Sequence, residues 1–94
     1  MAKILIVDDE PNILKVLSQI LQDEDHVVFT AANGRAALEA LEKHEPDLVF
    51  LDLWLPDVDG LAVLTDMRRQ WPDVPVVMIS GHGSIDTAVQ CTKN

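Results

Sequence analysis

Residues 3–9, KILIVDD, combine an unbroken apolar run with two carboxylates at its end. Ile4–Val7 is apolar at every position, whereas a strand with one solvated face is apolar at every second position. Continuous apolar strands are typical of parallel sheets that are covered by helices on both faces. The segment Lys3–Val7 therefore predicts a central strand of such a sheet, with Asp8 and Asp9 just beyond its carboxyl end.

Three further apolar segments predict strands, because they are rich in β-branched or aromatic residues and are bounded by breakers. They are Val27–Thr30 (VVFT), Asp47–Leu51 (DLVFL) and Val76–Ile79 (VVMI). The last two share the continuous apolar character of the first strand. Val27–Thr30 is short and has polar neighbours, so we expect it at an edge of the sheet.

Segments with apolar residues at helical spacing lie between these strands. The expected helices begin near Pro11, span Gly34–His44, begin after Gly60 and begin at Ser84. In the first helix, one face carries the apolar residues Ile13, Leu17, Ile20 and Leu21. Four alternating strands and helices fill the 94 residues and predict one α/β domain, a doubly wound parallel sheet of the form (βα)4.

The amino-acid composition disfavours two classes of binding partner, nucleic acids and membranes. Seven basic and sixteen acidic residues give a net charge of −9, which disfavours binding to nucleic acid or to an anionic membrane surface. The longest apolar runs have four residues, far fewer than the roughly 20 of a membrane-spanning helix. Cys91 is the sole cysteine, so no intrachain disulfide forms and a cytoplasmic location is expected.

Polar side chains follow three of the expected strands. Asp8 and Asp9 follow the first, Asp52 follows the third, and Ser80 follows the fourth. Taken singly, each is more often a capping or turn residue. Ligands of open α/β sheets bind beyond the carboxyl ends of the strands, at the point where the strand order reverses. We therefore expect three carboxylates and one hydroxyl to converge there.

Three neighbouring carboxylates repel one another, so they favour a bound proton or cation. An all-oxygen ligand set without His or Cys predicts a hard ion, Mg²⁺ or Mn²⁺. An Asp beside such an ion can attack phosphorus and form an aspartyl-phosphate. Ser80 would then donate a hydrogen bond to a phosphoryl oxygen, and Gly81 would leave room for that group.

Three segments together resemble the receiver domain of bacterial two-component response regulators: ILIVDDEPNI (4–13), LVFLDLWLPDVDG (48–60) and VPVVMISGHG (74–83). The resemblance implies a flavodoxin-like (CheY-like) fold with Asp52 as phosphoacceptor. It implies Mg²⁺ bound by Asp9 and Asp52, by Asp8 directly or through water, and by the backbone carbonyl of Trp54. Ser80 becomes the hydroxyl whose reorientation reports phosphorylation.

The stretch SGHGSIDTAVQ (80–90) is most similar to receivers of NtrC-like transcriptional activators. The resemblance implies a sensor histidine kinase as phosphodonor, control of an output such as transcription, and a switch that is no turnover enzyme. Trp54 and His82 are expected to flank the path of the water that hydrolyses the phosphoryl group. A Mg²⁺-dependent phosphatase is the enzymatic alternative, and Trp54 argues against it because such enzymes would want a second Asp there.

The resemblance also implies a fifth βα unit, whose strand carries a lysine that pairs with the acceptor and the phosphoryl group. Residues 1–94 are therefore expected to form a receiver domain that is incomplete at its C-terminus. Its strand order would then be 2-1-3-4. Val76–Ile79 would be an exposed apolar edge, which predicts self-association by strand pairing or exchange of elements. A fragment that interacts but does not switch is the remaining alternative.

Overall fold

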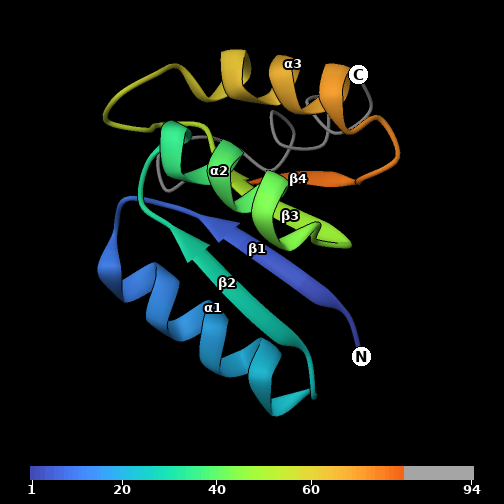
Figure 1. The fold of residues 1–94 in the computed structure, drawn as a ribbon. Helices are drawn as coiled ribbons and strands as arrows, with labels where there is room; N and C mark the ends of the chain where they lie inside the picture. Colours follow the sequence, from blue (N-terminus) through green and yellow to red (C-terminus); the bar gives the residue numbers. More distant parts are fainter. Residues whose placement is uncertain (80–94) are drawn as a thin grey trace.

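The computed structural model describes residues 1–79, and these form a four-stranded parallel sheet with three helices (Figure 1). The strands are β1 (Lys3–Val7), β2 (Val27–Ala31), β3 (Leu48–Asp52) and β4 (Val76–Ile79). Their order, β2-β1-β3-β4, confirms the predicted topology. Helix α1 (Pro11–Asp23) lies on one face, and α2 (Gly34–His44) and α3 (Gly60–Gln70) cover the other (Figure 1). The helix expected from Ser84 lies outside the described residues.

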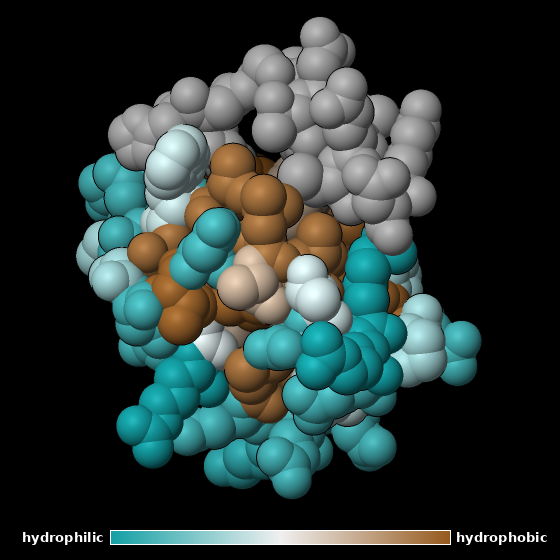
Figure 2. Space-filling model, turned by 90° about the horizontal axis from the view of Figure 1, so that it is seen from above, coloured by the Kyte–Doolittle hydropathy of each residue, from teal (hydrophilic) through white to brown (hydrophobic). Residues whose placement is uncertain are grey.

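The core lies between the central strands and the helices α2 and α3. Leu5, Val7 and Leu51 are fully buried on β1 and β3, and Leu41 and Met67 reach the same cluster from the helices. Strands covered on both sides need no polar face, which explains the continuous apolar runs. Figure 2 looks onto the side of α3 and shows apolar side chains gathered among hydrophilic ones.

Strand β2 is the edge strand that its composition predicts. It pairs with β1 alone among the strands of residues 1–79, and its residues are mostly exposed or half-buried. It extends to Ala31, one residue beyond the predicted end. Strand β3 begins at Leu48 and ends at Asp52, because Asp52 still pairs with Ile79 of β4. Asp52 is thus part of the strand and is held by the ladder.

The sheet covers the apolar face of helix α1 only in part. Ile13, Leu17 and Leu21 are half-buried, whereas Ile20 is 54% exposed. The apolar arc of α1 also includes Val16, and it is wider than the strip that β1 and β2 cover at this edge of the sheet. None of the helices formed by residues 1–79 is long and apolar enough to cross a bilayer.

Candidate metal centre

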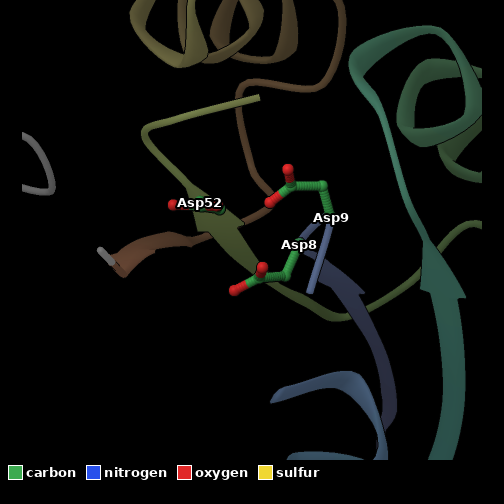
Figure 3. Close-up of side chains that lie close together, drawn as sticks. All are labelled: Asp8, Asp9 and Asp52. Carbon is green, nitrogen blue, oxygen red and sulfur yellow. The ribbon is translucent and has the colours of Figure 1, made fainter. Parts of the chain in front are cut away.

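The carboxylates of Asp8, Asp9 and Asp52 meet at the carboxyl ends of β1 and β3, as predicted (Figure 3). Each of the three offers an oxygen within 4.8 Å of the others. The parallel register pairs Val7 with Leu51, which brings the following residues to the same edge of the sheet. Strands β1 and β3 flank the reversal of strand order, where open α/β sheets bind ligands.

Backbone donors fix the orientation of two of these carboxylates. The N–H of Glu10 donates to Asp8 Oδ1 at 2.9 Å, and the N–H of Trp54 donates to Asp52 Oδ1 at 3.1 Å. Both bonds join a side chain to the amide two residues on, which is the geometry of an Asx turn. Asp8 and Asp52 are buried and Asp9 is exposed, so the cluster has one side open to solvent.

The loop between β3 and α3, residues 53–59, folds back tightly over the end of β3. Leu53 N–H donates to Ile79 O at 3.0 Å, and Gly60 N–H donates to Leu53 O at 3.1 Å. Trp54 and Asp59 form an isolated antiparallel bridge across the loop. A Cβ at Gly60 would lie 2.5 Å from Leu53 O and 2.7 Å from Asp52 O. Glycine is therefore required here by the close approach of two backbones.

Two aspartates of this loop hold helix N-termini, and sequence reasoning assigned neither role. Asp59 Oδ1 accepts from Leu61 N–H at 2.9 Å and caps α3. Asp57 accepts from Gly34 N–H at 2.8 Å and from Arg35 N–H at 3.1 Å, at the start of α2. The hydrogen bond from Gly34 is the main cause that lowers the pKa of Asp57. The role of Asp59 could have been predicted, because an Asp directly before the first residue of a helix is a common N-cap. No local sequence pattern relates Asp57 to α2.

Trp54 contacts the metal centre through its backbone. Its N–H donates to the carboxylate of Asp52, and the residue as a whole is 54% exposed. The loop also lines a shallow surface hollow of about 520 Å³, whose walls include Trp54, Pro56 and Leu61. The other expected site residues, Ser80, Gly81 and His82, lie outside the described residues.

The donor set suits a hard divalent cation. The three side chains offer carboxylate oxygens alone, the ligands that Mg²⁺ and Mn²⁺ prefer. Two of the carboxylates are buried, and a cation between them would offset their mutual repulsion. The open side at Asp9 leaves space for water or for a phosphate oxygen beside the ion. The residues present therefore fit a Mg²⁺ ion.

The profile of the response regulator receiver domain matches residues 4–94. The chain belongs to the response regulator receiver family. Receiver domains bind Mg²⁺ at an acidic pocket, and Asp8, Asp9 and Asp52 form such a pocket in this receiver.

Two relatives indicate the kind of regulator to which this receiver is similar. It is 49% identical over 92 residues to the nitrogen assimilation regulatory protein NtrX of Azorhizobium caulinodans, covering 96% of this chain and 20% of that protein. It is 37% identical over 92 residues to the transcriptional regulatory protein GlrR of Escherichia coli, covering 98% of this chain and 21% of GlrR. The chain thus spans about a fifth of the length of these curated relatives.

Solved structures agree with this placement. The receiver domain of NtrX from Brucella abortus superposes with a TM-score of 0.86 at 49% identity, covering 96% of this chain and 77% of that one. The response regulator TrrA of Thermotoga maritima, solved in complex with Mg(2+)-BeF, gives a TM-score of 0.84 at 35% identity. That match covers 98% of this chain and 82% of TrrA.

Proposed function

We propose that residues 1–94 act as a phosphoacceptor receiver, in which Asp52 takes a phosphoryl group from a phosphohistidine of a sensor histidine kinase. The observation that carries this proposal is the meeting of three carboxylates within 4.8 Å at the ends of β1 and β3. Asp52 is buried at the end of a central strand, and its carboxylate is oriented by Trp54 N–H. A nucleophile held in this way has lost orientational freedom before the donor arrives.

The carboxylates of Asp8, Asp9 and Asp52 would hold the Mg²⁺ ion, together with the backbone carbonyl of Trp54, and Mn²⁺ is an alternative. When bound, the ion supplies positive charge that offsets the charge on the phosphoryl oxygens in the transition state. Asp8 and Asp52 are pre-oriented by Glu10 N–H and Trp54 N–H, which lowers the cost of assembling the site. Asp9 faces solvent and completes the ligand set from the open side.

In the transfer step, an oxygen of Asp52 attacks phosphorus in line with the leaving imidazole. The new O–P bond forms as the N–P bond breaks, and the N–P electron pair returns to the nitrogen. The imidazole leaves as a neutral ring because its other nitrogen carries a proton. Burial of Asp52 limits its contact with water, and the bond from Trp54 N–H keeps one carboxylate oxygen fixed through the step. The product is an aspartyl-phosphate on the chain itself.

We propose that the response to phosphorylation involves Trp54 together with Ser80, Gly81 and His82, which lie outside the described residues. Ser80 would turn its hydroxyl to the phosphoryl oxygen, with Gly81 leaving room, and His82 and Trp54 would flank the path of the attacking water. The exposure of Trp54 supports its share of this role. Trp54→Asn should alter the half-life of the aspartyl-phosphate, and an unchanged half-life would remove the assignment.

The proposed setting is cytoplasmic signalling. The net charge of −9 suits a kinase that presents a basic face around its phosphohistidine, and it gives no support to nucleic acid or a membrane as partner of this domain. The likeness to NtrX and GlrR supports transcription as the controlled output. The added charge on Asp52 would bias an existing two-state equilibrium of the receiver.

We further propose that copies of the chain associate along β4. This strand occupies the outer position of the sheet among residues 1–79, and it pairs there with β3. An apolar outer strand is a template for pairing with another chain. Light scattering at high protein concentration tests this, and a monodisperse monomer would contradict it.

Intact-mass spectrometry with acetyl phosphate as a small phosphodonor tests the proposed function. The protein should gain one phosphoryl group with Mg²⁺, and it should gain none when EDTA removes the ion or when Asp52 is changed to Asn. A switch should show no turnover of a generic phosphate ester such as p-nitrophenyl phosphate. Such turnover would favour the phosphatase, and a folded protein that gains no phosphoryl group would favour the non-switching fragment.

A further inference from the structure

We propose that Asp57 is a positioning residue for this site: by binding the N-terminus of α2, it holds the β3–α3 loop in the shape that metal binding and phosphoryl acceptance require. The inference rests on the function proposed for Asp52 and adds a residue that acts on it from outside the ligand set. Asp57 lies three residues beyond Trp54, whose backbone contacts Asp52.

The contact between Asp57 and α2 is two-pronged. Oδ1 accepts from Gly34 N–H at 2.8 Å, and Oδ2 accepts from Arg35 N–H at 3.1 Å. The next free amide, Ala36 N–H, donates to Asn33 Oδ1 at 2.8 Å. The first three amides of α2 thus donate to two side chains: that of Asp57 in the loop, and that of Asn33, the N-cap directly before the helix. A carboxylate at the positive end of the helix dipole strengthens both of its bonds.

Close packing makes this contact specific. A Cβ at Gly34 would lie 2.4 Å from a methyl of Val58, 2.9 Å from a methyl of Val63 and 3.4 Å from Asp57 Oδ1. The loop therefore lies directly against the start of α2, and a glycine at that position lets it approach. Gly34 and the carboxylate of Asp57 thus form one contact between α2 and the loop.

Among the described residues, the middle of the loop makes no second hydrogen-bonded contact of this kind with another element. Its ends are fixed by Leu53 N–H to Ile79 O, by Gly60 N–H to Leu53 O and by the Trp54–Asp59 bridge. Within residues 1–79, the hydrogen bonds that tie the middle of the loop, residues 55–58, to another element are those of Asp57. Without them, residues 55–58 would keep no hydrogen bond to another element within residues 1–79, and we expect the backbone of the neighbouring Trp54 to shift.

The test compares Asp57→Ala with the matched variant Asn33→Ala. Both remove an acceptor from the same helix end, but Asn33 does not belong to the loop. Mg²⁺ affinity is measured by isothermal titration calorimetry, and the acetyl phosphate reaction is followed by intact mass. Both are measured at a temperature where circular dichroism shows each variant fully folded. Asp57→Ala should weaken Mg²⁺ binding about tenfold, the usual scale for residues that orient metal ligands, and should slow phosphorylation.

Asn33→Ala should destabilise the fold while leaving Mg²⁺ affinity and the phosphorylation rate unchanged. Asp57→Asn keeps one acceptor oxygen and should fall between Asp57→Ala and the wild type, which keeps the test valid if the alanine variant fails to fold. Wild-type Mg²⁺ affinity in the folded Asp57 variants, or equal weakening by Asn33→Ala, would overturn the positioning role alone. Failure of the wild type to bind Mg²⁺ would overturn the proposed function as well.

Discussion

Gly60 brings the start of α3 against the backbone that carries Asp52. The carbonyl oxygens of Asp52 and Leu53 occupy the place where a Cβ would stand, and backbone atoms at the end of a paired strand cannot turn aside. Gly34 is also crowded, but the nearest atom there is a methyl of Val58, a side chain that is 42% exposed. The two glycines therefore differ in what must move to admit a methyl group.

Gly60→Ala should cost about 1–3 kcal/mol of unfolding free energy, the scale of overpacking, and should slow phosphorylation because the shift reaches Asp52. Gly34→Ala should cost less, because the atoms nearest to the added methyl belong to side chains and not to backbone: Val58 can rotate toward solvent, and the buried Val63 must shift slightly. Urea unfolding of both variants and the acetyl phosphate reaction provide the comparison. Equal losses of stability, or normal phosphorylation of Gly60→Ala, would contradict the account of this close approach.

The pH dependence of Asp57 follows from its hydrogen bonds to α2. These bonds lower its pKa in the native state below the ordinary value of 3.8, so the unfolded chain binds the proton more tightly. The stabilisation is then fully present above about pH 3.8 and is lost as the pH falls through the lowered native pKa.

Urea midpoints of the wild type and Asp57→Asn should therefore differ at neutral pH and converge at pH values below 3.8. Asp73→Asn, which changes an exposed aspartate elsewhere, serves as the matched control for the change in net charge. If the difference between the urea midpoints of the wild type and Asp57→Asn stayed constant over the whole pH range, the charge of Asp57 would not stabilise the fold through these bonds.

The positions of site residues could be predicted where a polar side chain directly follows a strand that the sequence identifies. Asp8, Asp9 and Asp52 could be predicted to meet, because parallel strands end at one edge and the strands were recognisable from their apolar runs. Asp57 could not be predicted, because its two acceptor bonds reach residues that are 23 and 22 positions away in the chain. That contact depends on how α2 and the loop pack, which no local pattern encodes.

At the scale of elements, helices α1 and α2 differ in how much of their apolar face the sheet covers. Helix α2 contributes the fully buried Leu41 to the core, whereas α1 has no buried residue and exposes 54% of Ile20. Leu41→Ala should cost about 2–5 kcal/mol, because it leaves a cavity in the core. Ile20→Ala should cost about 1 kcal/mol or less, because much of the side chain is already hydrated.

Urea unfolding of the two alanine variants measures both values. The ordering is the essential result, since both variants remove aliphatic carbon from a helix position. An Ile20→Ala loss as large as that of Leu41→Ala would mean that the outer face of α1 is covered in solution.

The bounds of elements were predictable where a terminus has its own chemical signal. Helix α2 spans Gly34–His44 as expected, with Asn33 as its N-cap and Glu45 in the left-handed conformation at φ 50° after its end. Strand β3 ends one residue later than expected, because its partner β4 continues to pair with Asp52. Pairing partners are a tertiary property, so the composition of one strand does not fix its last residue.

The whole molecule carries an excess of negative charge, and part of it is concentrated at the metal centre. The net charge is −9, and two of the carboxylates, those of Asp8 and Asp52, are buried side by side. A cation that binds only the native state stabilises it in proportion to the logarithm of the ion concentration. Mg²⁺ should therefore raise the thermal midpoint more than NaCl of equal ionic strength does.

Asp52→Asn should raise the thermal midpoint in the absence of Mg²⁺, because it relieves repulsion within the cluster, and it should reduce the response to Mg²⁺. Asp73→Asn makes the same change of charge away from the cluster and should retain the full response. Differential scanning calorimetry provides the midpoints. If Mg²⁺ and NaCl raised the thermal midpoints of all three proteins equally, the rise would be due to general charge screening and not to ion binding at this centre.

Asp52 is the residue that we propose becomes phosphorylated. The protein is incubated with Mg²⁺ and acetyl phosphate and then reduced with borohydride, which converts an aspartyl-phosphate to homoserine. Peptide mass spectrometry then locates the product. We expect homoserine at position 52, dependent on Mg²⁺ and absent from Asp52→Asn. Homoserine at Asp8 or Asp9 instead, or unmodified Asp52 in a folded protein that binds Mg²⁺, would contradict it.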